Sequence, residues 1–193
     1  MFNWASFLTY TIITAYTPGP NNILCLTNGG RFGLRRTLPF CAGVWGGFLL
    51  VMVVCTLFCT LLSTLIPRIK MLMLVVGAAY MLYLAWKTLR SPADLGESGA
   101  KASLLSGFAL QFVNPKIYIY CIVSMEAYIL PHYAGQPLTL IGFMLILTLI
   151  GATATVCWAA FGSVFKLLFS RYARITNTVM ALLLVYCAIS LFL

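Results

Sequence analysis

Helix-breaking and polar residues occur together at two places inside long apolar stretches. The first reads TPGPN from Thr17 to Asn21 and is followed by Asn22, and the second reads NPK from Asn114 to Lys116. Proline has no N–H donor and its ring collides with the carbonyl four residues earlier, so a helix must break or bend at each place. Unpaired backbone facing lipid costs several kcal/mol per group, so such a break is tolerated only where it faces protein or water. We interpret both breaks as cavity walls, the alternative being kinks that serve packing alone.

The first break frees groups that can bind a small charged solute. Its two prolines deprive the carbonyls of Thr14 and Tyr16 of their helical partners. The amides of Asn21 and Asn22 can bond to freed backbone groups or to a solute. The helix that resumes after them begins with unpaired N–H groups and a partial positive charge, which suits a carboxylate.

Lys116 is the one basic residue inside an apolar stretch. It lies roughly twelve residues into the stretch that begins at Leu104, or about 18 Å along a helix, which is near the middle of a membrane. A cation at that depth is costly and by default marks a functional site that faces the protein interior. Two roles are open: attracting the carboxylate of a solute, or holding the ends of the first broken helix through their free carbonyls.

Glu126 is the one carboxylate inside an apolar stretch, about 15 Å beyond Lys116 on a different helix face, which excludes an intrahelical ion pair. We expect it near the outer membrane interface, and the alternative is a proton carrier. Tyr16, Tyr118 and Tyr120 flank the breaks and are candidates for lining a cavity. The candidate substrate-binding residues are Tyr16, Pro18, Gly19, Pro20, Asn21, Asn22, Asn114, Pro115 and Lys116.

No metal site, cofactor site or catalytic motif is evident. The seven cysteines lie inside apolar stretches without a C-x-x-C pair, and Cys55 and Cys59 have no histidine or carboxylate near them, so we expect them to serve packing. Phosphate-binding loops, H-E-x-x-H pairs and nucleophile elbows are absent. Three acidic residues supply little for acid–base catalysis, and we predict that the chain is not an enzyme.

The elements that position these residues are predicted to be membrane-spanning helices. The 193 residues are 62% hydrophobic and 8% charged, whereas soluble domains carry about 25% charged residues. A spanning helix needs about 20 mostly apolar residues. Six stretches reach that length with their flanks: Trp4–Thr27, Leu38–Leu65, Met71–Trp86, Leu104–Leu130, Leu138–Phe165 and Ile175–Leu193.

Lys and Arg residues between these stretches predict the orientation. Alternate segments (29–37, 87–101 and 166–174) carry nine of them, and the segment 66–70 on the other side carries two. Basic residues in short loops stay on the cytoplasmic side, so both termini are predicted outside. The net charge of +9 therefore reflects topology, and no aromatic and basic surface for nucleic acid is evident.

The stretches divide into two halves, about 1–90 and 104–193, joined by a cytoplasmic linker at about 91–103. Three crossings per half invert the second half relative to the first, and each half opens with its broken helix. Interruptions in corresponding helices of inverted repeats are the best pointer to a transporter binding site. Small residues, Gly43 and Gly47 in one stretch and Gly151, Thr155 and Ala159 in another, are expected to serve helix packing rather than substrate contact.

Five segments carry a family resemblance: YTPGPNNI (16–23), CAGVWGGF (41–48), GAAYMLYLAWK (77–87), FALQFVNPK (108–116) and ALLLVYCA (181–188). With these segments the chain resembles the LysE/RhtB-type family of bacterial amino-acid exporters over nearly its whole length. The resemblance implies an inner-membrane secondary exporter of small neutral or polar amino acids, usually driven by the proton motive force. The family's signature residues then fall on Pro18, Gly19, Pro20, Asn21, Asn114, Pro115 and Lys116.

The sequence thus predicts a single all-α integral membrane domain, with six transmembrane helices in two inverted three-helix repeats and interruptions in helices 1 and 4. Its predicted function is export of a small amino acid or derivative, with membrane lipid as surroundings and protons as the coupling ion. The alternatives are a non-transporting scaffold, a membrane-embedded enzyme subunit or a channel. The oligomeric state stays open, a homo-oligomer included.

Overall fold

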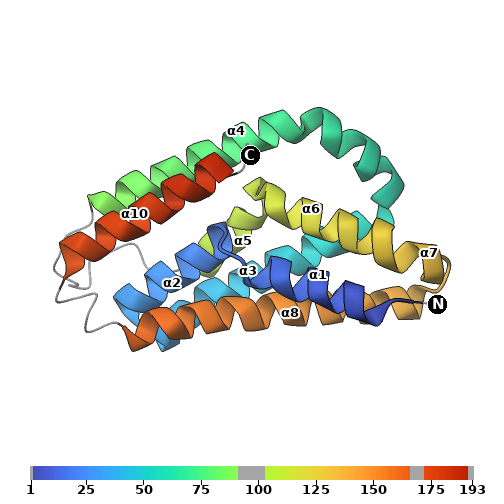
Figure 1. Ribbon diagram of the computed structural model, residues 1–193, viewed down its shortest axis with the longest axis horizontal. Helices are drawn as coiled ribbons and strands as arrows, with labels where there is room; N and C mark the ends of the chain where they lie inside the picture. The colour runs from blue at the N-terminus through green and yellow to red at the C-terminus, as the bar shows by residue number, and fades with distance from the viewer. Residues whose placement is uncertain (1, 91–102, 166–171, 191–193) are drawn as a thin grey trace.

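The computed structural model describes residues 2–90, 103–165 and 172–190, and these residues fold entirely into helices and their connections. Three segments lie outside the described residues: 91–102 from the predicted linker, 166–171 from the predicted loop at 166–174, and 191–193. The elements in chain order are α1 (Trp4–Tyr16), α2 (Pro20–Phe32), α3 (Leu34–Leu57), α4 (Cys59–Leu89), α5 (Leu104–Val113), α6 (Pro115–Val123), the π-helical segment η1 (Ser124–Ile129), α7 (Leu130–Tyr133), α8 (Pro137–Val164) and α10 (Ala173–Ser190) (Figure 1).

Both predicted helix breaks are confirmed. The first helix stops at Tyr16 and resumes as α2 at Pro20, and the fourth is interrupted at Asn114 with a bend of 67°. Pro20 and Pro115 each occupy the opening turn of the helix that follows. A missing N–H costs nothing there, because those donors have no helical acceptor, and the fixed φ of proline already suits the helix.

Two predicted loops are wrong. The segment 29–37 is helical on both sides of Gly33, whose φ of 81° and ψ of 164° end α2 and begin α3 in a single residue. That backbone region is essentially restricted to glycine. The segment 66–70 lies inside α4, and the chain turns at Phe58 instead. Arginine and lysine are good helix formers, so a basic cluster does not by itself exclude a helix.

The predicted loop at 131–137 is shorter than expected, because η1 and α7 carry the helix on to Tyr133. The fifth predicted stretch corresponds closely to α8, which runs from Pro137 to Val164. The described part of the sixth is α10.

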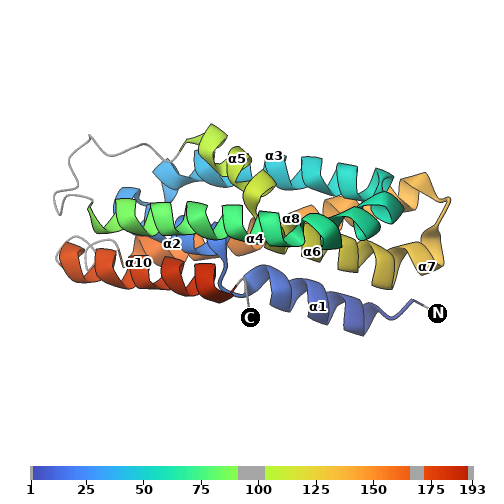
Figure 2. The same ribbon diagram turned by 90° about the horizontal axis from the view of Figure 1, so that it is seen from above.

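The two breaks lie near the middle of the molecule (Figures 1 and 2). From there α1 and α6 run toward one end, whereas α2 and α5 run toward the other. Helix α8 runs alongside both α1 and α2, and α3 packs against α2, α5, α6 and α8. Helices α4 and α10 lie side by side along one edge, and α10 ends near the level of the breaks (Figures 1 and 2). This arrangement brings the interrupted ends of both helices to one place.

Glycines let the helices that carry the breaks pack backbone to backbone. A Cβ added at Gly29 would collide with the backbone of Ala159 in α8, and one at Gly162 with the carbonyl of Leu26 in α2. Gly43 in α3 faces the backbone of α5 in the same way. Small residues allow this close approach in a membrane protein. The expected packing role of Gly43 and Ala159 is confirmed, because α2 packs closely on α8 and α5 packs closely on α3.

Apolar side chains cover much of the outer surface. On length and composition, α3 and α8 can each cross a membrane, with mean hydropathies of 2.2 and 2.3, and the bent pair Leu104–Val113 and Pro115–Tyr133 makes a third if it is one span. In the most apolar part of α8, 22% of the residues are buried. An apolar helix with so much exposed surface suits lipid rather than water. The all-helical membrane character is thus supported, and the six-span count remains a prediction.

Candidate functional site

Asn22 closes the first helix break by bonding to its freed backbone. Its side-chain amide donates to the carbonyl of Ala15 and to that of Thr17, both at 2.8 Å. The side chain is buried, and its Oδ1 has no hydrogen-bond partner among the described residues. One end of this amide therefore repairs the break, while the other is an acceptor beside it.

The two carbonyls that the prolines release also find partners in the protein. The carbonyl of Thr14 accepts from the hydroxyl of Thr17 at 2.8 Å, and that of Tyr16 accepts from Nε1 of Trp158 in α8 at 3.2 Å. Inside a membrane, backbone groups that water does not reach must be paired in this way. These carbonyls are therefore already occupied in this conformation.

Lys116 reaches from the second break to the first. Its Nζ donates to the carbonyl oxygen of Thr17 at 3.0 Å and to Oγ1 of the same residue at 2.9 Å. A Cβ on Gly19 would come within 3.0 Å of that Nζ, so the glycine leaves room for the lysine. This contact is the structural role considered for Lys116. An ammonium carries three donors, so one remains beyond the two that Thr17 receives.

A network of amides joins the two breaks directly. Nδ2 of Asn21 donates to Oε1 of Gln111 at 2.9 Å, and Nε2 of Gln111 donates back to Oδ1 of Asn21 at 3.1 Å. Asn114 donates to the same Oδ1 at 3.2 Å. Gln111 is 0% exposed and also donates to the carbonyl of Gly107. The paired bonds fix the start of α2 against the end of α5.

The two resumed helices begin differently at this site. Oδ1 of Asn114 accepts from the backbone N–H of Lys116 at 3.2 Å, so the N-terminus of α6 is capped by a side chain. Gly19 precedes α2 and has no side chain to provide such a cap. The first N–H groups of a helix have no partner within it and carry partial positive charge. The uncapped start of α2 is therefore suited to an anionic group.

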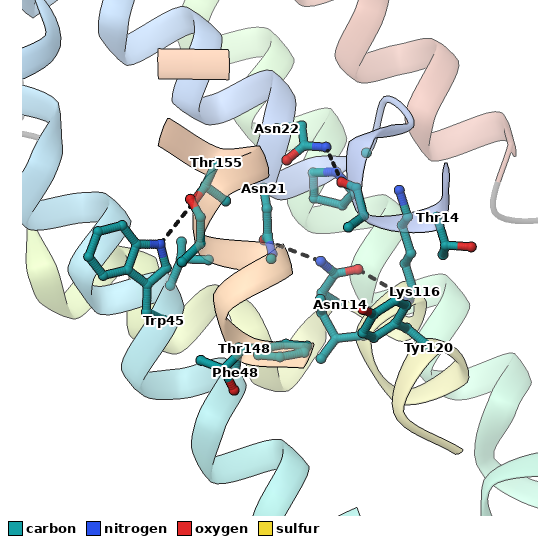
Figure 3. Close-up of a pocket in the computed structure, with 17 residues that line it drawn as sticks. Thr14, Asn21, Asn22, Trp45, Phe48, Asn114, Lys116, Tyr120, Thr148 and Thr155 are labelled. Atoms are coloured by element: carbon teal, nitrogen blue, oxygen red, sulfur yellow. Dashed lines mark hydrogen bonds between the residues drawn. The ribbon is translucent and has the colours of Figure 1, made fainter. Parts of the chain in front are cut away.

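These groups surround one cavity, in which about 50 Å³ is open to the centre of a water molecule. A single water needs about 10–15 Å³ by this measure, so the cavity suits a small solute or a few waters. Figure 3 shows Lys116 and Thr14 on one side, Trp45 and Thr155 on the other, and Asn21 between them. The lining residues are Thr14, Ala15, Gly19, Pro20, Asn21, Asn22, Asn114 and Lys116 near the breaks, and Val44, Trp45, Phe48, Ile117, Tyr120, Thr148, Gly151, Ala152 and Thr155 around them.

The wall opposite the lysine is aromatic and held in place. Nε1 of Trp45 in α3 donates to Oγ1 of Thr155 in α8 at 2.8 Å, and that hydroxyl donates to the carbonyl of Ala152 at 2.8 Å. On the lysine's own side, Tyr120 follows Lys116 by one turn of α6, and its ring packs against that of Phe48 at 5.8 Å between centroids (Figure 3). The buried Tyr120 hydroxyl has no hydrogen-bond partner in the part of the chain that the structure describes.

The structure brings most of the predicted site residues to the cavity. Gly19, Pro20, Asn21, Asn22, Asn114 and Lys116 line it, whereas Tyr16, Pro18 and Pro115 belong to the breaks without lining it. The Tyr16 hydroxyl lies 3.9 Å from Sγ of Cys157. The Tyr118 hydroxyl instead donates to the carbonyl of Phe112 at 3.4 Å. Glu126 is exposed on η1, away from the cavity.

Sequence reasoning missed Gln111 and Trp45, and it assigned Gly151 and Thr155 to packing although both line the cavity. An amide inside an apolar stretch was a usable signal for Gln111, because polar groups in a span need a partner. Nothing local distinguishes the others. Within the described residues, no three histidine, cysteine or acidic side chains are grouped to hold a metal ion.

Comparison with known proteins agrees with this geometry. Residues 12–193 match the LysE type translocator family. The chain is 43% identical to the cysteine/O-acetylserine efflux protein of Escherichia coli strain K12, with 97% of this chain and 96% of that protein covered. It is 44% identical to the protein of the same name from Salmonella typhimurium strain LT2, with the same coverage. No solved structure matches the chain. The chain therefore belongs to the LysE type translocator family and is a multi-pass membrane transporter, not an enzyme.

Proposed function

We propose that the chain exports small amino acids of the cysteine and O-acetylserine type from the cytoplasm across the bacterial inner membrane. The observation that carries this proposal is the cavity at which two interrupted helices meet, with a lysine and an uncapped helix start in its wall. Interrupted helices of corresponding repeats form the substrate site in many secondary transporters. The names of the relatives support the choice of substrate.

The polar wall offers complementary groups for a zwitterion. The remaining donor of Lys116 and the free N–H groups at the start of α2 receive the carboxylate. Oδ1 of Asn22 accepts from the ammonium group. The lysine thus serves both roles, since it holds Thr17 with two donors and the solute with the third. The side chain of the solute then faces the aromatic and small residues across the cavity.

Alternating access requires the two halves to move around this site. We place six spans in two inverted repeats, with both termini outside, because basic residues gather in alternate segments. The amide network between Asn21 and Gln111 lies where the halves meet. Export against a gradient is driven by the proton motive force in this proposal, with protons as the coupling ion.

The test is efflux from proteoliposomes preloaded with labelled cysteine or O-acetylserine, with and without an imposed pH gradient. Lys116→Met removes the charge while keeping an extended apolar side chain. A hydrogen bond to a charged group contributes about 1.5–3 kcal/mol, so efflux falls about 10- to 100-fold. Lys87→Met is the matched control, because Lys87 is exposed on α4 outside the cavity. Wild-type efflux by inserted Lys116→Met protein refutes the site, and equal efflux with and without the gradient refutes the proton coupling.

A further inference from the structure

Helix α8 presents one continuous face to the cavity. Thr148, Gly151, Ala152 and Thr155 line it, and their spacing of three and four residues places them on the same side of a helix. The hydroxyls of Thr148 and Thr155 donate back to the carbonyls of Met144 and Ala152, both at 2.8 Å. Their protons are therefore not directed at a solute. This face acts as a smooth wall rather than as a set of hydrogen-bond donors.

Gly151 is not explained by helix packing. Apart from its chain neighbours and the backbone of its own helix, no atom of the described residues lies within 4 Å of a Cβ added there. At Gly29 and Gly162, by contrast, the added Cβ would collide with the facing backbone. Glycine inside a helix is destabilising by about 0.5–1 kcal/mol relative to alanine. Because Gly151 lies on the face that lines the cavity, the space beside it belongs to the cavity.

The opposite walls fix how an amino acid lies in that space. Its charged head groups are held by Lys116 and the start of α2, so its side chain extends toward α3 and α8 (Figure 3). Trp45 cannot swing aside freely, because its indole N–H is bound to Thr155. The depth available to the side chain of the bound amino acid is then limited by the face of α8 that lines the cavity.

We propose that Gly151 sets the upper size limit for the side chain of the exported amino acid. This inference rests on the proposed function. The glycine leaves a recess into which a longer side chain, such as an acetylated serine, extends past the wall formed by Thr148 and Thr155. A side chain at position 151 fills that recess without displacing any protein group.

The experiment compares efflux of cysteine and O-acetylserine from proteoliposomes that contain wild-type, Gly151→Ala or Gly151→Val protein. One methylene of fit in an apolar pocket changes selectivity about 10- to 200-fold. We expect Gly151→Val to lower the ratio of O-acetylserine to cysteine efflux at least about tenfold, with Gly151→Ala in between. Gly142→Val is the matched control, since Gly142 is also on α8 with open space around an added Cβ but does not line the cavity.

The outcomes separate this inference from the proposed function. An unchanged ratio in a Gly151→Val protein that still exports overturns the size limit and leaves the proposed function intact. If Gly151→Val lowers the efflux of both solutes equally, while the protein still elutes in gel filtration as a folded protein, the size limit is also overturned. Gly151 then does not select between the two solutes. If wild-type protein exports neither solute, the proposed function itself fails and this inference fails with it.

Discussion

The amide pair between Asn21 and Gln111 ties the two interrupted helices together, and a double-mutant cycle measures its contribution. Asn21→Ala removes both bonds of the pair, at 2.9 and 3.1 Å, and leaves Oε1 of the fully buried Gln111 without a donor. An unsatisfied buried group costs about 1–3 kcal/mol. Gln111→Ala removes the same two bonds from the other side. Each single variant already removes the two bonds, so the second substitution cannot remove them again. The loss of unfolding free energy in the double variant is therefore about 1–3 kcal/mol smaller than the sum of the losses in the two single variants.

The assay is reversible unfolding in mixed micelles titrated with SDS and followed by tryptophan fluorescence. Thr178→Ala combined with Asn21→Ala is the control cycle, because Thr178 is exposed on α10 and bonds to the carbonyl of Arg174 in its own helix. Independent sites are additive within about 0.3–0.5 kcal/mol. If the losses of the Asn21 and Gln111 variants are additive within that range as well, the amide pair does not couple the two helices.

Two further predictions use the same unfolding titration. Asn22→Ala removes the donors to the carbonyls of Ala15 and Thr17 and lowers the free energy of unfolding by about 1–3 kcal/mol. Ordinary surface substitutions change the free energy of unfolding by less than about 0.5 kcal/mol, so a loss in that range contradicts the proposed role of Asn22. Gly162→Leu drives a side chain into the backbone of α2 and costs about 1–3 kcal/mol or more, whereas Gly142→Leu, which meets open space, stays within about 0.5 kcal/mol of wild type. Equal losses for these two leucine variants contradict the close packing of α2 on α8.

The helix breaks could be predicted because their cause is local. A proline removes its own N–H and displaces the carbonyl four residues earlier, whatever surrounds it. The breaks at Pro20 and Pro115 therefore appear where the sequence places them. The apolar character of the chain is likewise a property of composition, and it is matched by the exposed apolar surface of α8.

Helix ends without proline were harder to place. The basic clusters at 29–37 and 66–70 are typical of loops, yet they lie largely or wholly within helices. Charge predicts where a chain meets the membrane surface, because it reports the cost of leaving water. Charge does not predict where helical hydrogen bonding stops. At Gly33 it stops because the residue has a positive φ of 81°, in a backbone region that is essentially restricted to glycine.

Composition and proline positions already predict an apolar helical protein with two interrupted helices and a lysine beside one of them. The partners of these residues emerge only in the folded chain: Lys116 meets Thr17, Gln111 meets Asn21, and Trp45 meets Thr155. A helix that is apolar on every side gives no periodic signal for the face that turns inward, so these pairs are not predictable from the pattern. That choice depends on how the helices cross, and backbone contacts such as that between Gly162 and Leu26 fix the crossing only once the chain has folded.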